Sequence, residues 1–301
     1  MNYWLFTFIF IIVLFLYLHI YHHLKISNDL EVYSIVNPTK NNLEEICGLK
    51  QPVIFTLETP MLTDLNMETL KKHYGTFKIN IQNYEIEDTR SIKYMESVPF
   101  KLDEALGFLK LEYERSKGFI SYNNSDFLDE TNIRKIIKNN DMFLRPSMVS
   151  KCEYDIIMGS KESLTRTKYN INYRNYFISL DNSVTIRVVN PIYDKYMDRD
   201  NNYMDFEFNS PLNIWDIQEQ YKEDFGKVRT TDIILNKGDV LFIPPYWFYS
   251  IKFDNCGSIL NMNYRTYMNT LSIVPELSMY YLQNQNIKLN SKNVYKDNST
   301  I

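Results

Sequence analysis

The stretch LNKGDVLFIPPYWFY, residues 235–249, decides the fold. Its apolar run Val240–Ile243 follows the turn sequence Asn-Lys-Gly-Asp, and another apolar run, Ile233–Leu235, precedes that turn. Two short apolar runs around a glycine-containing turn predict a β-hairpin. A Pro-Pro pair ends the second run, because proline cannot donate to a strand ladder. The aromatic residues after it predict a further strand that packs inward.

The same alternation continues on both sides of this stretch. Val184, Ile186 and Val188 alternate with polar residues after the turn sequence 181–183, which predicts another hairpin, and residues 259–264 predict a further strand. Short strands with regular turns predict a double-sheet jelly roll, with its core over about 145–270. Before it, helical periodicity covers 61–74, 102–113 and a segment from Ile133, with a strand at 77–81. After it, 271–284 is again helical.

Composition excludes one class of partner. The chain has 301 residues, 45% of them hydrophobic, a net charge of −4 and a pI of about 5.7. This length and apolar content suffice for a large buried core. The acidic balance lacks the basic surface of a nucleic-acid-binding protein, so we expect no nucleic-acid partner.

The N-terminus predicts a membrane anchor. Residues 3–21 carry no charge and as a helix would span roughly 28 Å, close to the ~30 Å of a bilayer core. A basic start and a small-residue cleavage site are both missing, which favours an uncleaved transmembrane helix in 1–24 over a signal peptide. Lys25 slightly favours the large domain on the cytoplasmic side. Residues 25–44 are polar and predict a linker, and the Asn- and Lys-rich residues 286–301 predict a disordered tail.

Between about residues 45 and 285 the chain resembles the cupin-like branch of the JmjC superfamily, the branch of the asparagine hydroxylase that inhibits the hypoxia-inducible factor. The likeness rests on residues 238–247, on 173–177 with Asn190-Pro191, and on Arg145-Pro146. It implies a mainly β fold with flanking helices, a double-stranded β-helix of jelly-roll type. The anchor and the Asn/Ile/Lys-rich composition are similar to those of giant-virus proteins, which implies a host endomembrane or virion membrane.

The resemblance also assigns positions. The family places its first iron-binding histidine six residues before an asparagine, here Asn175, which points to Tyr169. The second histidine falls on Tyr249, 80 residues further on, and the acidic ligand on Ile171. The lysine that binds 2-oxoglutarate falls on Val184. The resemblance therefore implies a site whose metal and co-substrate positions are all replaced.

The histidines point the same way. The chain has four, at positions 19, 22, 23 and 73, and none from residue 74 to 301. Non-haem Fe(II) oxygenases hold iron with two histidines and a carboxylate, and a phenol with a pKa near 10 is a poor substitute for imidazole. We therefore expect no metal and no cofactor.

The leading hypothesis is a membrane-anchored, catalytically inactive domain that binds an unknown protein or small molecule or has a structural role. We favour Tyr169 and Tyr249 as rings that fill the vacated pocket. The sharper alternative is a pocket for an anionic small molecule or a peptide carboxylate, lined by these phenols and by Asn175, Arg174, Arg187 and Trp247. A 2-oxoglutarate/Fe(II)-dependent protein hydroxylase with atypical ligands is the rival function. Helix 271–284 either joins two chains in a homo-oligomer or packs on its own domain.

Overall fold

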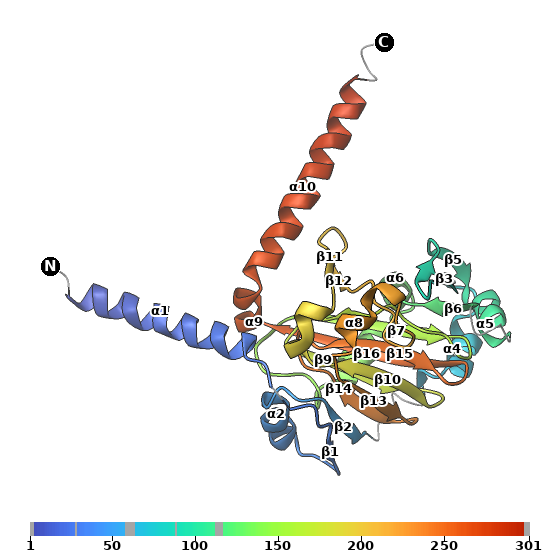
Figure 1. Ribbon diagram of the computed structural model, residues 1–301, viewed down its shortest axis with the longest axis horizontal. Helices are drawn as coiled ribbons and strands as arrows, with labels where there is room; N and C mark the ends of the chain where they lie inside the picture. Colours follow the sequence, from blue (N-terminus) through green and yellow to red (C-terminus); the bar gives the residue numbers. More distant parts are fainter. Residues whose placement is uncertain (1–2, 28, 58–63, 88, 112–116, 298–301) are drawn as a thin grey trace.

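Two β-sheets form the body of the protein, and two long helices project from it (Figure 1). The computed structural model describes residues 3–27, 29–57, 64–87, 89–111 and 117–297, and for 287–297 only the helix path. The projecting helices are α1 (Tyr3–Leu24) and α10 (Val274–Asp297), and both leave the body beside the short helix α9 (Tyr267–Ser272).

The larger sheet has the strand order β1-β2-β14-β9-β16-β7-β6-β3-β4, with β5 paired to β3. The smaller sheet has the order β11-β12-β8-β15-β10-β13. Of the larger sheet, the bounds are β1 (Tyr33–Ile35), β2 (Val53–Thr56), β3 (Lys78–Ile86), β4 (Ile92–Tyr94), β5 (Val98–Lys101), β6 (Lys117–Ser121), β7 (Val149–Gly159), β9 (Arg174–Ser179), β14 (Asp239–Phe242) and β16 (Gly257–Thr266). Those of the smaller sheet are β8 (Lys168–Tyr169), β10 (Val184–Val189), β11 (Asp200–Asn202), β12 (Glu207–Asn209), β13 (Thr230–Leu235) and β15 (Phe248–Phe253).

Both expected hairpins are corrected by the strand pairing. β13 pairs with β10 in the smaller sheet, whereas β14 pairs with β2 and β9 in the larger one. β9 and β10 are likewise split between the sheets. The turn residues expected from the sequence are present, with Gly238 at a φ of 87° that favours glycine. These turns carry the chain from one sheet to the other, so the chain segments beside them run in facing layers.

The core has two layers because the strands of the larger sheet alternate in the direction of their side chains. On β9, Phe177 faces the smaller sheet and packs with Ile186 and Ile251. Tyr176 and Ile178 face the opposite way, toward a layer of helices. These helices are α2 (Lys40–Gly48), α4 (Met67–Tyr74), α5 (Leu102–Lys110), α6 (Ser125–Glu130) and α7 (Ile133–Asn140). The helices expected over 102–113 and from Ile133 thus correspond to α5 and α7. Residues 112–113, and residues 61–63 of the first expected helix, lie outside the described residues.

The connection from β10 to β13 carries little regular structure. It contains two 3-10 turns and one short helix besides the β11–β12 pair. These elements are η1 (Pro191–Tyr196), η2 (Glu219–Tyr221) and α8 (Lys222–Phe225).

Helix α1 is apolar, exposed and fixed to the body at its C-terminal end. Among the described residues, α1 is the one helix that is long and apolar enough to cross a membrane. Near its end His23 is only 5% exposed, and Asn269 Nδ2 of α9 lies 2.9 Å from its Nε2. Residues 25–44, expected as a linker, run along the body: β1 adds to the edge of the larger sheet, and Asn190 Nδ2 donates to the carbonyl of Ser27 (2.9 Å).

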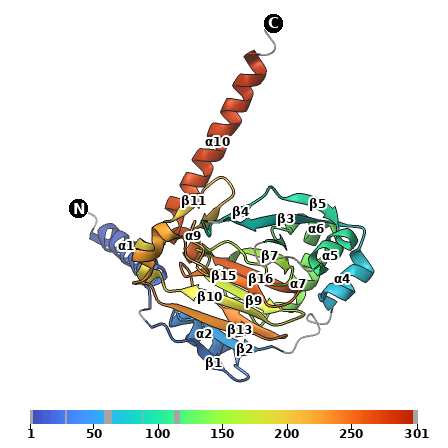
Figure 2. The same ribbon diagram turned by 45° about the vertical axis from the view of Figure 1, so that its right-hand side comes forward.

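The C-terminal part forms two helices where the sequence predicted one over 271–284. Helix α10 continues to Asp297 and so includes most of the stretch expected to be disordered. Its first turns contact the body through Leu277 and through Tyr280, whose ring lies 5.6 Å from that of Phe206. Beyond these turns the helix projects away from both sheets (Figure 2).

Candidate functional site

Tyr249 lies in the apolar core between the two sheets. Its strand, β15, alternates, so that Tyr249 and Ile251 face the larger sheet. The Tyr249 ring is 5.0 Å from that of Phe177, and Trp247 is buried in the same cluster. Burial raises the pKa of Tyr249, which keeps its hydroxyl protonated at neutral pH. The side chain therefore acts as a ring in the core with a neutral hydroxyl at its end.

Tyr169 faces the other way. In the pairing of β8 with β15, Tyr169 is opposite Phe248, and the residue opposite Tyr249 is Lys168. Tyr169 packs against Phe248 and Phe208 on the outer side of the smaller sheet, and its hydroxyl donates to Asn201 Oδ1 (2.8 Å). The structure thus separates the two tyrosines that the sequence spacing had assigned to one site.

Ile171 and Val184 are also apart from each other. Ile171 belongs to the outer cluster with Tyr169. Val184 is in the core between the sheets, paired with Leu235 and Phe253 at the far ends of their strands. Both side chains are buried among apolar groups.

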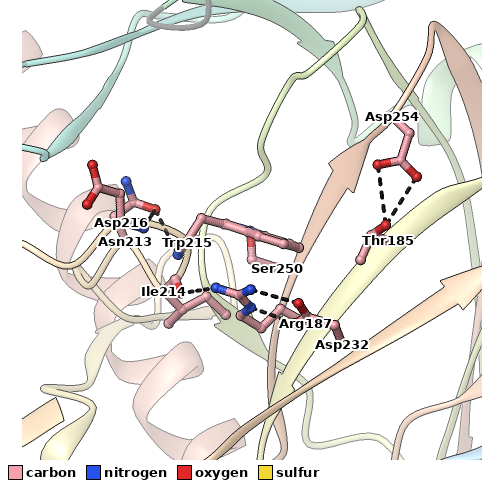
Figure 3. A network of polar contacts seen from close by, with 9 residues as sticks. All are labelled: Thr185, Arg187, Asn213, Ile214, Trp215, Asp216, Asp232, Ser250 and Asp254. Atoms are coloured by element: carbon pink, nitrogen blue, oxygen red, sulfur yellow. Dashed lines mark hydrogen bonds and ion pairs between the residues drawn. The ribbon is translucent and has the colours of Figure 1, made fainter. Parts of the chain in front are cut away.

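The two arginines expected to line a pocket lie on opposite outer faces. Arg174 faces the helix layer. Arg187 points away from the core, because Val184, Ile186 and Val188 of its strand face inward. Figure 3 shows its two-pronged ion pair with Asp232 (2.6 and 2.7 Å). Arg187 also donates to the Ile214 carbonyl (2.9 Å) and stacks 4.3 Å from the Trp215 ring. All its charged contacts are satisfied, so Arg187 is a structural residue of the smaller sheet.

Asn175 faces the core and ends a chain of amides. Asn170 donates to Asn263 (3.1 Å), Asn263 donates to Asn261 (2.8 Å), and Asn261 donates to Asn175 (2.9 Å). Burial raises the pKa of Tyr249, and a hydrogen bond from the Asn175 side chain acts against that rise. The chain of amides therefore ends at the Tyr249 hydroxyl in the core.

Charged groups flank this amide chain. Asp155 and Asn261 are paired across β7 and β16, and Lys168 is opposite Tyr249. Burial raises the pKa of Asp155. Two influences act against that rise: the hydrogen bonds donated by the backbone N–H groups of Asn123 and Asn124, and the charge of Lys168. The position across from Tyr249 therefore carries an ammonium group with a carboxylate near it.

A separate cavity opens beside Thr167 and Asn209, with Arg166 in its wall. It has a volume of about 250 Å³ and is lined mainly by polar side chains, which include the amides of Asn213 and Gln218 and the carboxylate of Asp200. The Arg166 guanidinium stacks 4.2 Å from the Tyr94 ring, and its Nε is buried without a hydrogen-bond partner. Among the described residues no carboxylate forms an ion pair with Arg166. Arg166 therefore places a guanidinium in the cavity wall, where it also hydrogen-bonds to the side chain of Tyr122.

The sequence alone did not point to Arg166, Lys168, Asp155 or the amides of Asn170, Asn261 and Asn263. One signal was present, because Leu164, Arg166, Lys168 and Asn170 stand at every second position. In a strand such residues share one face, which here changes from apolar to polar along the chain. Alternation cannot show which residue is opposite Tyr249, because that depends on the pairing of strands 80 residues apart in the chain.

The donor set does not fit the iron of an oxygenase. In the part of the chain that the structure describes, no three His, Cys, Asp or Glu side chains gather as metal ligands. The side chains around Tyr249 are a lysine, amides, aromatic rings and the carboxylates of Asp155 and Glu207. This set has no imidazole, and the ammonium group repels a cation. No catalytic step through iron and 2-oxoglutarate is therefore derived for these residues.

Two facing sheets with helices on one outer face, and turns that pass the chain between them, define a double-sheet β domain. The family model for the cupin-like domain matches residues 38–270. The chain therefore belongs to the cupin-like domain family. No curated protein matches the chain.

Proposed function

We propose that this protein is a membrane-anchored cupin-like binding module that holds the carboxylate of a small molecule or peptide at Arg166. In this proposal the two facing sheets are the jelly roll of the family, and the domain is catalytically inactive. The observation that carries the proposal is the unpartnered Arg166 Nε in the wall of a 250 Å³ cavity.

The chemistry favours an anion with planar oxygens. A guanidinium presents its N–H groups as a fork that matches a carboxylate, and Asn209 adds an amide for a polar neighbour. The amides of Asn213 and Gln218 are bonded to the backbone and hold the wall in place. The cavity is slightly smaller than a typical drug-sized site, which suits a small acid or the end of a peptide. The nearby Tyr94 ring keeps the guanidinium in place by stacking.

Calorimetric titration of the full chain in nonionic detergent tests this proposal. Succinate and a peptide with a free C-terminus serve as probes against the wild type, Arg166→Met and Arg187→Met. We expect binding of at least one probe to weaken about tenfold or more in Arg166→Met, the loss of one charge-assisted contact. Arg187→Met is the matched control on the outer face and should bind as the wild type does. Equal binding by Arg166→Met would contradict the proposal.

The anchor is the second part of the proposal. It rests on α1, whose most apolar 18-residue stretch has a mean hydropathy of 2.3 and no buried residue. Residues 3–21 would then lie in a bilayer, with the domain on the cytoplasmic side of a host or virion membrane. Extraction of expressing membranes with alkaline carbonate tests it: the full chain should stay in the pellet, and its release into the supernatant would show that α1 does not span.

A further inference from the structure

Two buried cations lie on the opposite side of the larger sheet from the Arg166 cavity. Lys50 follows α2 and has a left-handed backbone, with a φ of 62°. Arg174 is the first residue of β9 and faces the helix layer. The site formed by Lys50 and Arg174 was not indicated by any motif in the sequence.

Both side chains are buried with unused donors. Lys50 is 4% exposed and Arg174 1%. Neither Lys50 Nζ nor Arg174 Nη1 has a hydrogen-bond partner, and Arg174 Nη2 reaches only the backbone carbonyl of Glu44, at 3.4 Å. Within the described ranges no carboxylate forms an ion pair with either cation. The two positive charges therefore have no carboxylate in ion-pair contact, and the Glu44 carboxylate acts on Arg174 without forming an ion pair.

Aromatic rings compensate for only part of this burial. The Tyr173 ring lies 5.3 Å from Lys50 Nζ and 4.1 Å from the Arg174 guanidinium, and Phe242 lies 5.3 Å from Arg174. Stacking on rings stabilises a buried cation less than an ion pair does, and an unpaired buried charge is strongly destabilising. An anion that contacts both cations would remove this penalty.

The location suggests where the anion comes from. Lys25, Lys50 and Arg174 lie close enough to His22 of α1 to act on it electrostatically. The site is therefore beside the end of the apolar helix, and Figure 1 shows α2 next to that end. In a membrane-anchored chain this is the level of the lipid headgroups, where phosphate groups are concentrated.

We propose that Lys50 and Arg174 bind a phosphate group at the foot of α1. The guanidinium fork and the ammonium together supply the donors that phosphate oxygens accept. Tyr173 is partly exposed and contacts both cations, so its ring covers the site and has to move aside for the phosphate. The phosphate belongs either to a phospholipid or to a soluble molecule, and this site is independent of the Arg166 cavity.

Thermal unfolding of the full chain in nonionic detergent tests the proposal, with inorganic phosphate as the probe at constant ionic strength. Phosphate should raise the midpoint of the wild type. In Lys50→Met and in Arg174→Met the concentration for half of this effect should rise about tenfold or more. Lys135→Met, an exposed lysine on α7, is the matched control and should respond as the wild type does. The proposal would be overturned if neither phosphate nor phosphatidic acid vesicles raised the midpoint of the wild type. It would also be overturned if both variants responded to phosphate as the wild type does.

Unfolding of the wild type in vesicles gives a second readout that does not depend on how well a variant folds. The full chain is reconstituted in vesicles of phosphatidylcholine with and without phosphatidic acid, which separates the two sources of phosphate. A higher midpoint with phosphatidic acid identifies a lipid, and a higher midpoint with inorganic phosphate alone identifies a soluble ligand. An unchanged midpoint with every probe would refute the site.

Discussion

Replacing Lys50 with Met should stabilise the protein when no phosphate is present, although it removes a charged residue. Burial, together with the charge of Arg174, lowers the pKa of Lys50 from 10.5 to about 8. That difference corresponds to about 3 kcal/mol of folding free energy. Methionine fills a similar volume without a charge, so we expect Lys50→Met to gain up to about this amount at neutral pH.

The gain should depend on pH in a defined direction. Below about pH 8 Lys50 is protonated in both the folded and the unfolded chain, and the folded wild type carries the full penalty. Between about pH 8 and 10.5 the folded lysine is neutral while the unfolded one still holds its proton. The stability of the wild type therefore rises through this window. The advantage of Lys50→Met should shrink over the same window and end above it.

Denaturant unfolding in mild detergent and phosphate-free buffer, repeated across this pH range, measures the effect. The relevant quantity is the difference in unfolding free energy between wild type and variant, because the many tyrosines titrate in both. Lys135→Met should differ little from the wild type at any pH. If Lys50→Met is less stable than the wild type at neutral pH, or if its gain does not change with pH, the assignment of an unpaired buried charge at Lys50 is refuted.

Other substitutions test the packing and the chemistry of the domain. A Cβ at Gly159 would lie 2.2 Å from the Phe253 ring. Gly159→Ala should therefore lower the free energy of unfolding, measured with denaturant, by about 1–3 kcal/mol or more. Gly48→Ala is the control and should not destabilise the protein, because a Cβ there would have nothing within 4 Å. Tyr169→Phe removes the hydrogen bond to Asn201 and should cost about 1 kcal/mol; no change would mean that the hydroxyl is solvated as well without Asn201. Added Fe(II) should show no stoichiometric binding in metal analysis, and 2-oxoglutarate turnover would contradict an inactive domain.

The sequence shows which residues alternate, but the partners of each strand are set by distant parts of the chain. The glycine turn at Gly238 was correctly placed, yet Leu235 pairs with Val184 and Val240 pairs with Phe55 and Ile178. Local turn chemistry is the same for a hairpin and for a crossing between facing sheets. The sequence therefore predicted hairpins, the structures in which such turns are most common. The choice between a hairpin and a crossing depends on which strands bury their apolar faces against each other.

The same limit explains the site. A change of one residue in register moves every side chain of a strand to the other face. Counting from Asn175 gave Tyr169, and the observed pairing puts Lys168 opposite Tyr249 instead. Asn175 and Trp247, expected as lining of a pocket, face the core between the sheets, whereas Arg174, the neighbour of Asn175, necessarily faces the helices.

Helix α1 and the domain form one folded unit through His23. Asn269 Nδ2 lies 2.9 Å from His23 Nε2 and also donates to the Ile171 carbonyl (3.1 Å), so this amide links α1 to the chain beside β8. The His23 ring further contacts Tyr246, at 5.9 Å. Removing residues 1–24 deletes this buried contact.

A chain that begins at Lys25 should therefore unfold at a lower temperature than the full chain in the same detergent. His23→Ala in the full chain should reproduce part of that loss, at about 1 kcal/mol for the hydrogen bond with more for the lost packing. His19→Ala is the matched control, since His19 is exposed and bonds only within α1. Equal stability of the shortened and full chains would mean that α1 is tethered to the domain without packing on it. The orientation of the Lys50–Arg174 site toward the bilayer would then no longer be fixed by α1.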